Sequence, residues 1–274
     1  MSEIKLVVAD IDNTLRAALR GMPRINKKAI RDLHDGNIMF GLASGRTVEQ
    51  LADIARGWKL GFEPELIIGV NGSSMYDGLT QKKEDLLTFE KEWILEVMDF
   101  LDAHNYDYHV YIDDYTLFKR EDVQYQKLFK NIERDIRIAQ SREDFLQGSF
   151  FKFLLTIDPS KFDQLVRDFQ PLQKRHPNDF KLLKTTKFSY EVVHARTSKA
   201  LPLEHFCAEH GIDLKEVAAF GDAENDNEMI KAAGMGVCLK DGEEETRKLA
   251  DYITDLTCGR GGFGDFVYKH ILNE

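Results

Sequence analysis

The sequence is poor in cysteine and has no histidine or cysteine pair spaced for a metal. Its three cysteines, Cys207, Cys238 and Cys258, are odd in number and widely separated. They predict neither a disulfide framework nor a CxxC metal pair. The eight histidines show no metal-ligand spacing either, so we expect them to be ordinary core or surface residues.

Long apolar runs and excess positive charge are also absent. The opening MSEIKLVVADID reaches acids before any apolar stretch long enough for a signal peptide or a membrane span, so we expect a cytoplasmic protein. The net charge of −10 argues against a nucleic-acid or membrane-surface binder, which needs a basic face. A few local cations or a metal can still accommodate a small anionic substrate. No protein partner can be inferred.

The pattern of short apolar runs and helical segments predicts an α/β fold with a Rossmann-like parallel-sheet core. Continuous rather than alternating apolar character is typical of strands that are covered on both faces. The predicted strands are Ile4–Ala9, Ile38–Leu42, Leu66–Val70, Val217–Phe220, Met235–Leu239 and Tyr252–Thr254. The predicted helices between them are Asn26–Asp35, Val48–Arg56, Ser198–His210 and Asn225–Ala233.

The middle of the chain has a different pattern, which predicts an inserted α+β domain over residues 81–188. Its candidate strands Tyr106–Ile112, Phe150–Ile157 and Lys181–Lys184 look longer and more alternating, and amphipathic helices intervene. Tyr190–Val193 is expected to lead back toward the first domain. The core domain is therefore expected to comprise residues 1–80 and 189–274.

Polar residues follow the predicted core strands at the points where each strand ends. Ligands bind beyond the carboxyl ends of the strands in open parallel sheets, so these residues are expected to converge at one edge. They are Asp10, Asp12 and Thr14 after the first strand, Ser44, Gly45 and Arg46 after the second, Asn71 after the third, and Asp222, Asn225 and Asp226 after Val217–Phe220.

Four carboxylates at one edge cannot all be bare anions, because like charges a few ångströms apart oppose each other's ionisation. A divalent cation resolves this, and ligands that are all oxygen favour Mg²⁺. Since Mg²⁺ often also binds substrate phosphate, a phosphorylated substrate follows, and a carboxylate can itself attack phosphorus. Taken singly, each acid is better explained as a helix cap or turn former than as a catalytic group.

Four motifs in this order resemble the haloacid dehalogenase (HAD) superfamily of phosphatases, in its Cof-like, type IIB branch with a C2 cap. They are DIDNT at Asp10–Thr14, Ser44 in LASGR, Lys199 in TSKA, and GDAENDNEM at Gly221–Met229. The resemblance covers essentially the whole chain, including the length of the insert. It implies a substrate-specificity cap over residues 81–188.

The resemblance also implies roles for individual residues. Asp10 would be the nucleophile and a ligand of Mg²⁺. Asp12 would act as general acid and then as base, and its backbone carbonyl would bind the metal. Lys199 would neutralise the nucleophile and the phosphate. Asp222 and Asp226 would hold the metal, and the remaining positions would contact substrate: Ser44, Gly45, Arg46, Asn71 and Asn225.

The reaction implied is Mg²⁺-dependent hydrolysis of a small phosphorylated metabolite, a sugar phosphate first, through an aspartyl-phosphate. A phosphomutase that uses the same nucleophile is the alternative, followed by a non-catalytic binding protein on the same fold. For four arginines, the sequence leaves two alternative roles. Arg46 could bind phosphate or pair with an acid, and Arg16, Arg20 and Arg24 could contact substrate or form a solvated face.

Overall fold

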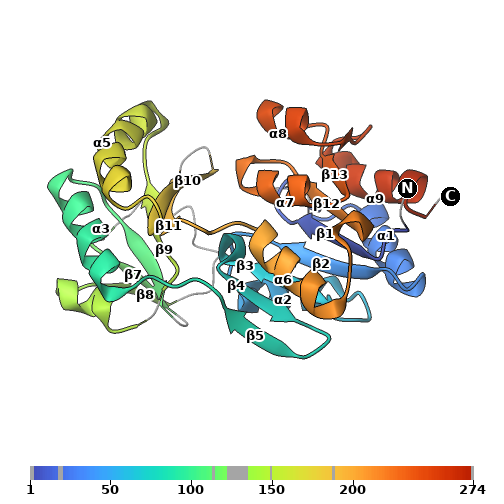
Figure 1. The fold of residues 1–274 in the computed structure, drawn as a ribbon, viewed down its shortest axis with the longest axis horizontal. Coiled ribbons are helices and arrows are strands. Elements are labelled where there is room, and N and C mark those ends of the chain that lie inside the picture. Colours follow the sequence, from blue (N-terminus) through green and yellow to red (C-terminus); the bar gives the residue numbers. More distant parts are fainter. Residues whose placement is uncertain are drawn as a thin grey trace. The chain divides into compact units, whose positions relative to one another are not determined.

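The computed structural model describes residues 3–17, 21–112, 115–121, 135–148, 150–186 and 189–272. The chain divides into two compact units, drawn in Figure 1. The first comprises Met1–Leu86 and Ser198–Glu274, and the second is the intervening Leu87–Thr197. That the second unit selects the substrate stays a prediction. In the described part of the chain, no helix is both long enough and apolar enough to cross a membrane.

The first unit is built on an eight-stranded sheet. In sheet order its strands are β14 (Tyr252–Ile253), β13 (Met235–Cys238), β12 (Val217–Gly221), β1 (Leu6–Asp10), β2 (Met39–Ala43), β3 (Leu66–Gly69), β4 (Ser74–Asp77) and β5 (Lys82–Asp85). The first six are mutually parallel, while β4 and β5 are added antiparallel. The predicted parallel-sheet core is confirmed.

Helices cover both faces of this sheet because successive strand residues point to opposite sides and both sides are apolar. In β1, Val7 and Ala9 belong to one buried cluster, and Leu6 and Val8 belong to another. The first cluster includes residues of α1 (Arg24–Asp35), α2 (Val48–Trp58) and α9 (Gly262–His270). The second includes residues of α6 (Ala200–His210) and α7 (Asn227–Ala232). A short helix, α8 (Glu244–Leu249), completes the unit.

The antiparallel hairpin of β4 and β5 was not predicted. The sequence of β5 is Lys-Lys-Glu-Asp, and three of its four residues are exposed. An edge strand has only one strand neighbour, and charged residues are common there because they discourage further pairing. Such a strand lacks the apolar run on which the other predictions of strands were based.

The second unit contains a separate six-stranded sheet with helices on one face. Its strands are β10 (Phe180–Thr186), β11 (Ser189–His194), β9 (Lys152–Thr156), β6 (His109–Ile112), β7 (Tyr115–Phe118) and β8 (Asp135–Ile138) in sheet order. Apolar residues of α3 (Lys91–Ala103) and α5 (Phe162–Arg175) share a buried core with Val110, Phe153 and Val192 of the sheet.

The stretch Tyr190–Val193 forms most of β11, which pairs with β10 on one side and with β9 on the other. It belongs to the last strand of the second unit, and the chain enters the first unit again at Ser198. Residues 189–197, which were expected in the core domain, therefore lie in the second unit of the structure.

Candidate active site

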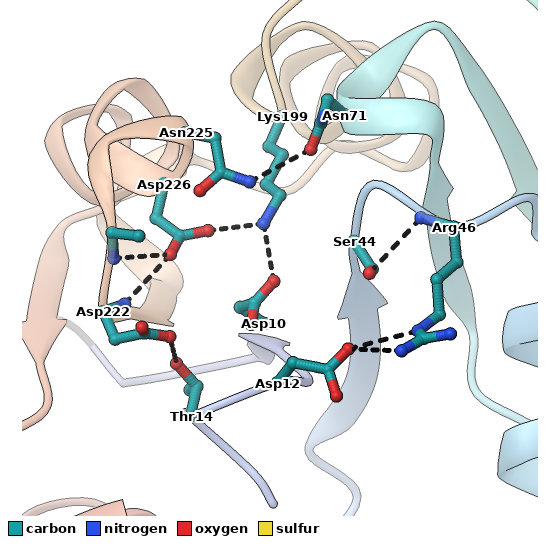
Figure 2. Close-up of polar contacts among 11 residues, drawn as sticks. Asp10, Asp12, Thr14, Ser44, Arg46, Asn71, Lys199, Asp222, Asn225 and Asp226 are labelled. Carbon is teal, nitrogen blue, oxygen red and sulfur yellow. Dashed lines mark hydrogen bonds and ion pairs between the residues drawn. The ribbon is translucent and has the colours of Figure 1, made fainter. Parts of the chain in front are cut away.

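Four adjacent parallel strands of the first unit bring the predicted site residues together at one edge of the sheet (Figure 2). Asp10 is the last residue of β1, in register with Ala43 at the end of β2. The other strand-end residues lie in the loops that follow β1, β2, β3 and β12: Asp12, Ser44, Gly45, Arg46, Asn71, Asp222, Asn225 and Asp226. Lys199 is the residue directly before α6, and its side chain extends to the same edge of the sheet.

The Lys199 ammonium lies at the centre of this group. Its side chain is fully buried, and Nζ donates to Asp10 Oδ1 at 2.6 Å and to Asp226 Oδ1. Figure 2 shows the ammonium between the two carboxylates. A buried ammonium is costly without partners, so the two aspartates explain how the lysine can be buried here.

Asp226 is held by the loop that carries Asp222. Its Oδ2 accepts hydrogen bonds from the backbone N–H of Asp222 at 2.9 Å and of Ala223 at 3.1 Å. Gly221 allows this close packing, because a Cβ there would lie 2.4 Å from the Asp226 Cβ. Thr14 Oγ1 donates to Asp222 Oδ1 at 2.7 Å and so joins the first and last motifs.

Burial dominates the ionisation of these acids. Burial raises the pKa of Asp10 to about 7, although Lys199 opposes the rise and Asp226 adds to it. Burial also raises the pKa of Asp222 to about 8, and the nearby Asp10 and Asp226 carboxylates reinforce the effect. For Lys199, burial acts to lower the pKa, but Asp10 and Asp226 outweigh it and hold the pKa above its ordinary value.

Asp12 has a different environment, between two guanidinium groups. Arg46 donates from Nε at 3.1 Å and from Nη2 at 2.9 Å to Asp12 Oδ2, and Arg16 Nε donates to Oδ1 at 2.9 Å. Burial acts to raise the pKa of Asp12, but Arg46 and then Arg16 outweigh it, so the pKa is lowered. Of the two readings of Arg46, this structure shows the pairing with an acid.

The serine and asparagine loops pack against one another. Asn71 donates its backbone N–H to the Ser44 carbonyl at 3.0 Å, and its Oδ1 accepts from Asn225 Nδ2 at 3.1 Å. A Cβ at Gly45 would lie 3.2 Å from Asn71 Nδ2, so glycine permits this approach. Asn71 has a φ of 54°, a left-handed conformation that asparagine tolerates better than most residues.

Gly72 is required by the approach of the segment that delivers Lys199. Its φ is +100°, and a Cβ there would lie 1.9 Å from the Ser198 carbonyl oxygen. No side chain fits at that distance, so glycine lets the loop after β3 pack directly against Ser198, just before the start of α6. The Asn-Gly pair after β3 thereby helps to place the lysine.

The chemistry of the donor set fits a hard divalent cation. Carboxylate oxygens of Asp10, Asp222 and Asp226 all lie within 4.8 Å of one another, and all three residues are buried. Their three negative charges face a single ammonium, which leaves an excess of two when all are ionised. Burial raises the pKa of two of them, as expected for carboxylates whose charge the surrounding protein compensates only in part. Oxygen ligands of this kind suit Mg²⁺.

Two contacts of the site were not predicted in detail. The hydrogen bond from Thr14 to Asp222 had no signal in the sequence. The four-residue spacing from Asp12 to Arg16 was the only hint of their ion pair. Arg24 is exposed at the start of α1, and Arg20 lies outside the described residues.

Comparison with known proteins gives a consistent result. Residues 7–266 match the family described as haloacid dehalogenase-like hydrolases. The chain is 26% identical to Phosphatase YwpJ of Bacillus subtilis, over 98% of this chain and 100% of the relative. It is also 26% identical to 5-amino-6-(5-phospho-D-ribitylamino)uracil phosphatase YcsE of the same organism, over 94% and 93%. A crystal structure of a haloacid dehalogenase-like hydrolase from Bacteroides thetaiotaomicron superimposes with a TM-score of 0.84, at 24% identity, over 97% and 99% of the two chains.

Proposed function

The chain belongs to the haloacid dehalogenase-like hydrolase family, and we propose that it is a phosphatase of the type IIB branch, which hydrolyses small phosphomonoesters with Mg²⁺ through an aspartyl-phosphate. The observation that carries the proposal is the ammonium of Lys199 between Asp10 and Asp226, with Asp222 alongside. This arrangement offers a carboxylate nucleophile, a fixed cation beside it and a set of oxygens for a metal.

In the first half of the reaction, Asp10 attacks phosphorus and the bond from phosphorus to the alcohol oxygen breaks. Lys199 neutralises Asp10 and the phosphoryl oxygens, and Ser44 donates a hydrogen bond to the same group, with Gly45, Asn71 and Asn225 shaping its surroundings. Asp10, Asp222, Asp226 and the Asp12 carbonyl would hold Mg²⁺. When bound, Mg²⁺ supplies positive charge that lowers repulsion between the nucleophile and the phosphate.

In the second half, water attacks the aspartyl-phosphate, and phosphate and free Asp10 are produced. Arg46 and Arg16 keep Asp12 ionised in this structure, which suits its role as the base that takes the proton of the water. To protonate the leaving alcohol in the first half, Asp12 has to give up a guanidinium contact and acquire a proton. Phosphate binding to Arg46 would allow that exchange, which is how we interpret its predicted role in substrate binding.

A sugar phosphate is the substrate class we favour, as the sequence predicted, and the protein is expected to act in the cytoplasm. Because a relative is named for a phosphorylated ribitylamino-uracil, that compound belongs in the panel of candidates. Pyridoxal phosphate and flavin mononucleotide complete it. The second unit would select among them by closing over the leaving group.

The test is release of inorganic phosphate from this panel and from an activated aryl phosphate. Each compound is measured with Mg²⁺, with excess EDTA, and with Asp10→Asn. We expect turnover that requires the metal and is lost in the variant. Asp53→Asn is the matched control, because Asp53 is an exposed aspartate of α2, and it should keep full activity.

Two results would overturn the proposal. Absence of phosphate release from every compound would exclude hydrolysis and direct attention to phosphoryl transfer between substrates. Full activity of Asp10→Asn would show that another residue attacks phosphorus. Trapping of the labelled phosphoryl group on Asp10 after acid quench, followed by peptide mapping, identifies the nucleophile directly.

A further inference from the structure

A second group of metal-ligating side chains lies outside the acid centre, the cluster of Asp10, Asp222 and Asp226 with Lys199. It is carried by the hairpin strand β5 and the helix α6 of the first unit. Its members are Glu84 of β5 and His205 and Glu209 of α6. One turn of helix separates His205 from Glu209, so both side chains lie on the same face. One ligand atom from each of the three residues lies within 4.8 Å of the other two.

The imidazole of His205 is directed at both carboxylates without a hydrogen bond to either. Its Nε2 is 3.4 Å from Glu84 Oε2 and 3.6 Å from Glu209 Oε1. This nitrogen is buried and has no hydrogen-bond partner within the part of the chain that the structure describes. At these distances the nitrogen forms ion pairs with the two carboxylates when the imidazole is protonated. It makes no hydrogen bond to them, and buried polar atoms normally make one.

A neighbouring pair shows what a direct contact looks like in the same region. His210 Nε2 lies 2.9 Å from Asp77 Oδ2, the length of a hydrogen bond. Asp77 also accepts from Leu79 N, Thr80 N and Thr80 Oγ1. Asp77 and His210 could also hold an ion together with Glu209, but the lone pairs of Asp77 already accept these four contacts, so we read the contact between Asp77 and His210 as a structural link.

The separations around His205 instead match those between ligands of one metal ion. Bonds from Zn²⁺ to imidazole nitrogen and carboxylate oxygen are about 2.1 Å long, and two ligands at that distance in a tetrahedral site lie about 3.4 Å apart. The distances of 3.4 and 3.6 Å are therefore too long for good hydrogen bonds and suitable for a shared ion.

We propose that Glu84, His205 and Glu209 form a second cation site, for a divalent transition metal of the Zn²⁺ type. One imidazole with two carboxylates favours such an ion over Mg²⁺, which prefers oxygen ligands. All three side chains are partly exposed, so water can complete the fourth position. The ion links the edge strand β5 to α6.

The two linked elements are those next to the junctions between the units. β5 ends at Asp85, just before Leu87 begins the second unit, and α6 begins at Ala200, just after Thr197 ends it. Lys199 directly precedes α6. A metal at this site would therefore stabilise the part of the first unit from which the chain leaves and to which it returns, next to the helix that Lys199 precedes.

The test is metal binding by the whole protein, read by calorimetry with Zn²⁺ and by the visible spectrum of bound Co²⁺, in excess Mg²⁺. Asp222→Asn, which disables the acid centre, serves as the background. We expect one Zn²⁺ bound in this background. His205→Gln and Glu84→Gln should each weaken that binding at least tenfold, and X-ray absorption should show an imidazole ligand.

His34→Gln is the matched control. His34 lies 3.5 Å from one carboxylate, that of Glu65, and belongs to a different part of the first unit. This variant should bind Zn²⁺ as the background protein does. Binding of Zn²⁺ that is unchanged in both His205→Gln and Glu84→Gln, or no binding in the background protein, would overturn the proposal. Neither readout depends on phosphatase activity.

Discussion

Each unit buries charged side chains, but the two sets differ in balance. In the first unit, the three carboxylates of Asp10, Asp222 and Asp226 face the single ammonium of Lys199. In the second, Lys152 Nζ lies 2.7 Å from Glu191 Oε1, with side chains only 4% and 6% exposed, one charge of each sign. A balanced pair can satisfy itself. An unbalanced cluster requires a cation or a substrate, and that difference distinguishes a site from a structural contact.

The balanced pair also has a neutral histidine beside it. Burial, and then the nearby Lys152 ammonium, lower the pKa of His109 to about 3. The His109 ring stacks on Phe118, with ring centroids 4.6 Å apart. Here a buried ion pair lies beside a histidine whose pKa favours the neutral form, whereas the first unit brings three buried carboxylates together.

The largest expected effect is that of removing the one cation of the unbalanced cluster. Lys199→Met leaves three buried carboxylates without their ammonium and removes the charge beside Asp10. We expect kcat to fall by about 1000-fold, as for loss of a key electrostatic group. Steady-state kinetics in saturating Mg²⁺ measure it, and Lys231→Met, an exposed lysine of α7, is the control. A fall of less than tenfold would contradict the role of Lys199.

Breaking the balanced pair should affect stability. Glu191→Gln leaves the Lys152 ammonium buried without its counter-charge, and such changes cost about 3–5 kcal/mol of the free energy of unfolding. Urea unfolding followed by fluorescence measures the loss. Glu92→Gln, an exposed glutamate of α3, is the control.

A double replacement sharpens the same point. Lys152→Met combined with Glu191→Leu should recover most of the stability lost in Glu191→Gln, because no charge is left buried. If the double variant were as unstable as the single one, the pair would have a role beyond charge balance.

A third effect, of intermediate size, is the pH dependence due to His109. The pKa in the folded state is below the ordinary value of 6.5, so the unfolded state binds more protons between these two pKa values. The contribution of His109 to the free energy of unfolding is therefore fully present above pH 6.5 and is lost as the pH falls toward its folded-state pKa. We expect about 2 kcal/mol to be lost between pH 7 and pH 5. Urea unfolding at pH 7 and at pH 5 measures this loss, and in His109→Gln it should be smaller by that amount. The same pH dependence of stability in the variant and the wild type would refute the role of His109.

The smallest effect has the opposite sign. Asp222→Asn removes one of the crowded carboxylates, and the asparagine Oδ1 can still accept the hydrogen bond of Thr14. In EDTA we expect the variant to be about 1 kcal/mol more stable than the wild type, because the variant avoids the cost of burying or protonating the third carboxylate. In Mg²⁺ the order should reverse, since the metal stabilises the wild type. Thermal unfolding in the two buffers measures both, and a less stable variant in EDTA would contradict the charge imbalance.

The core of the fold was predictable because its strands are apolar on both faces. All six predicted core strands are present, within about two residues at each end. The hairpin of β4 and β5 was missed because charged edge residues carry no strand pattern. The pairing of β11 with β9 was not predictable, because α5 and β10 separate the two strands in sequence.

Which residues gather at the candidate active site was predictable for a similar reason. Parallel strands end at a common edge, so residues that follow β1, β2, β3 and β12 had to meet there. The contacts among them were not predictable. The two arginines on Asp12 and the bond from Thr14 to Asp222 depend on side-chain directions in turns, for which the sequence has no periodic signal.

By itself, the sequence determined the parallel core, the family and the residues available for chemistry, because these depend on local patterns and on motif order. Only the tertiary structure decided how charge is distributed. It placed Lys199 against two carboxylates, Arg46 and Arg16 against Asp12, and Glu84 beside His205. These pairings join residues up to 189 positions apart. Their energies depend on distance and burial, which exist only after the chain has folded.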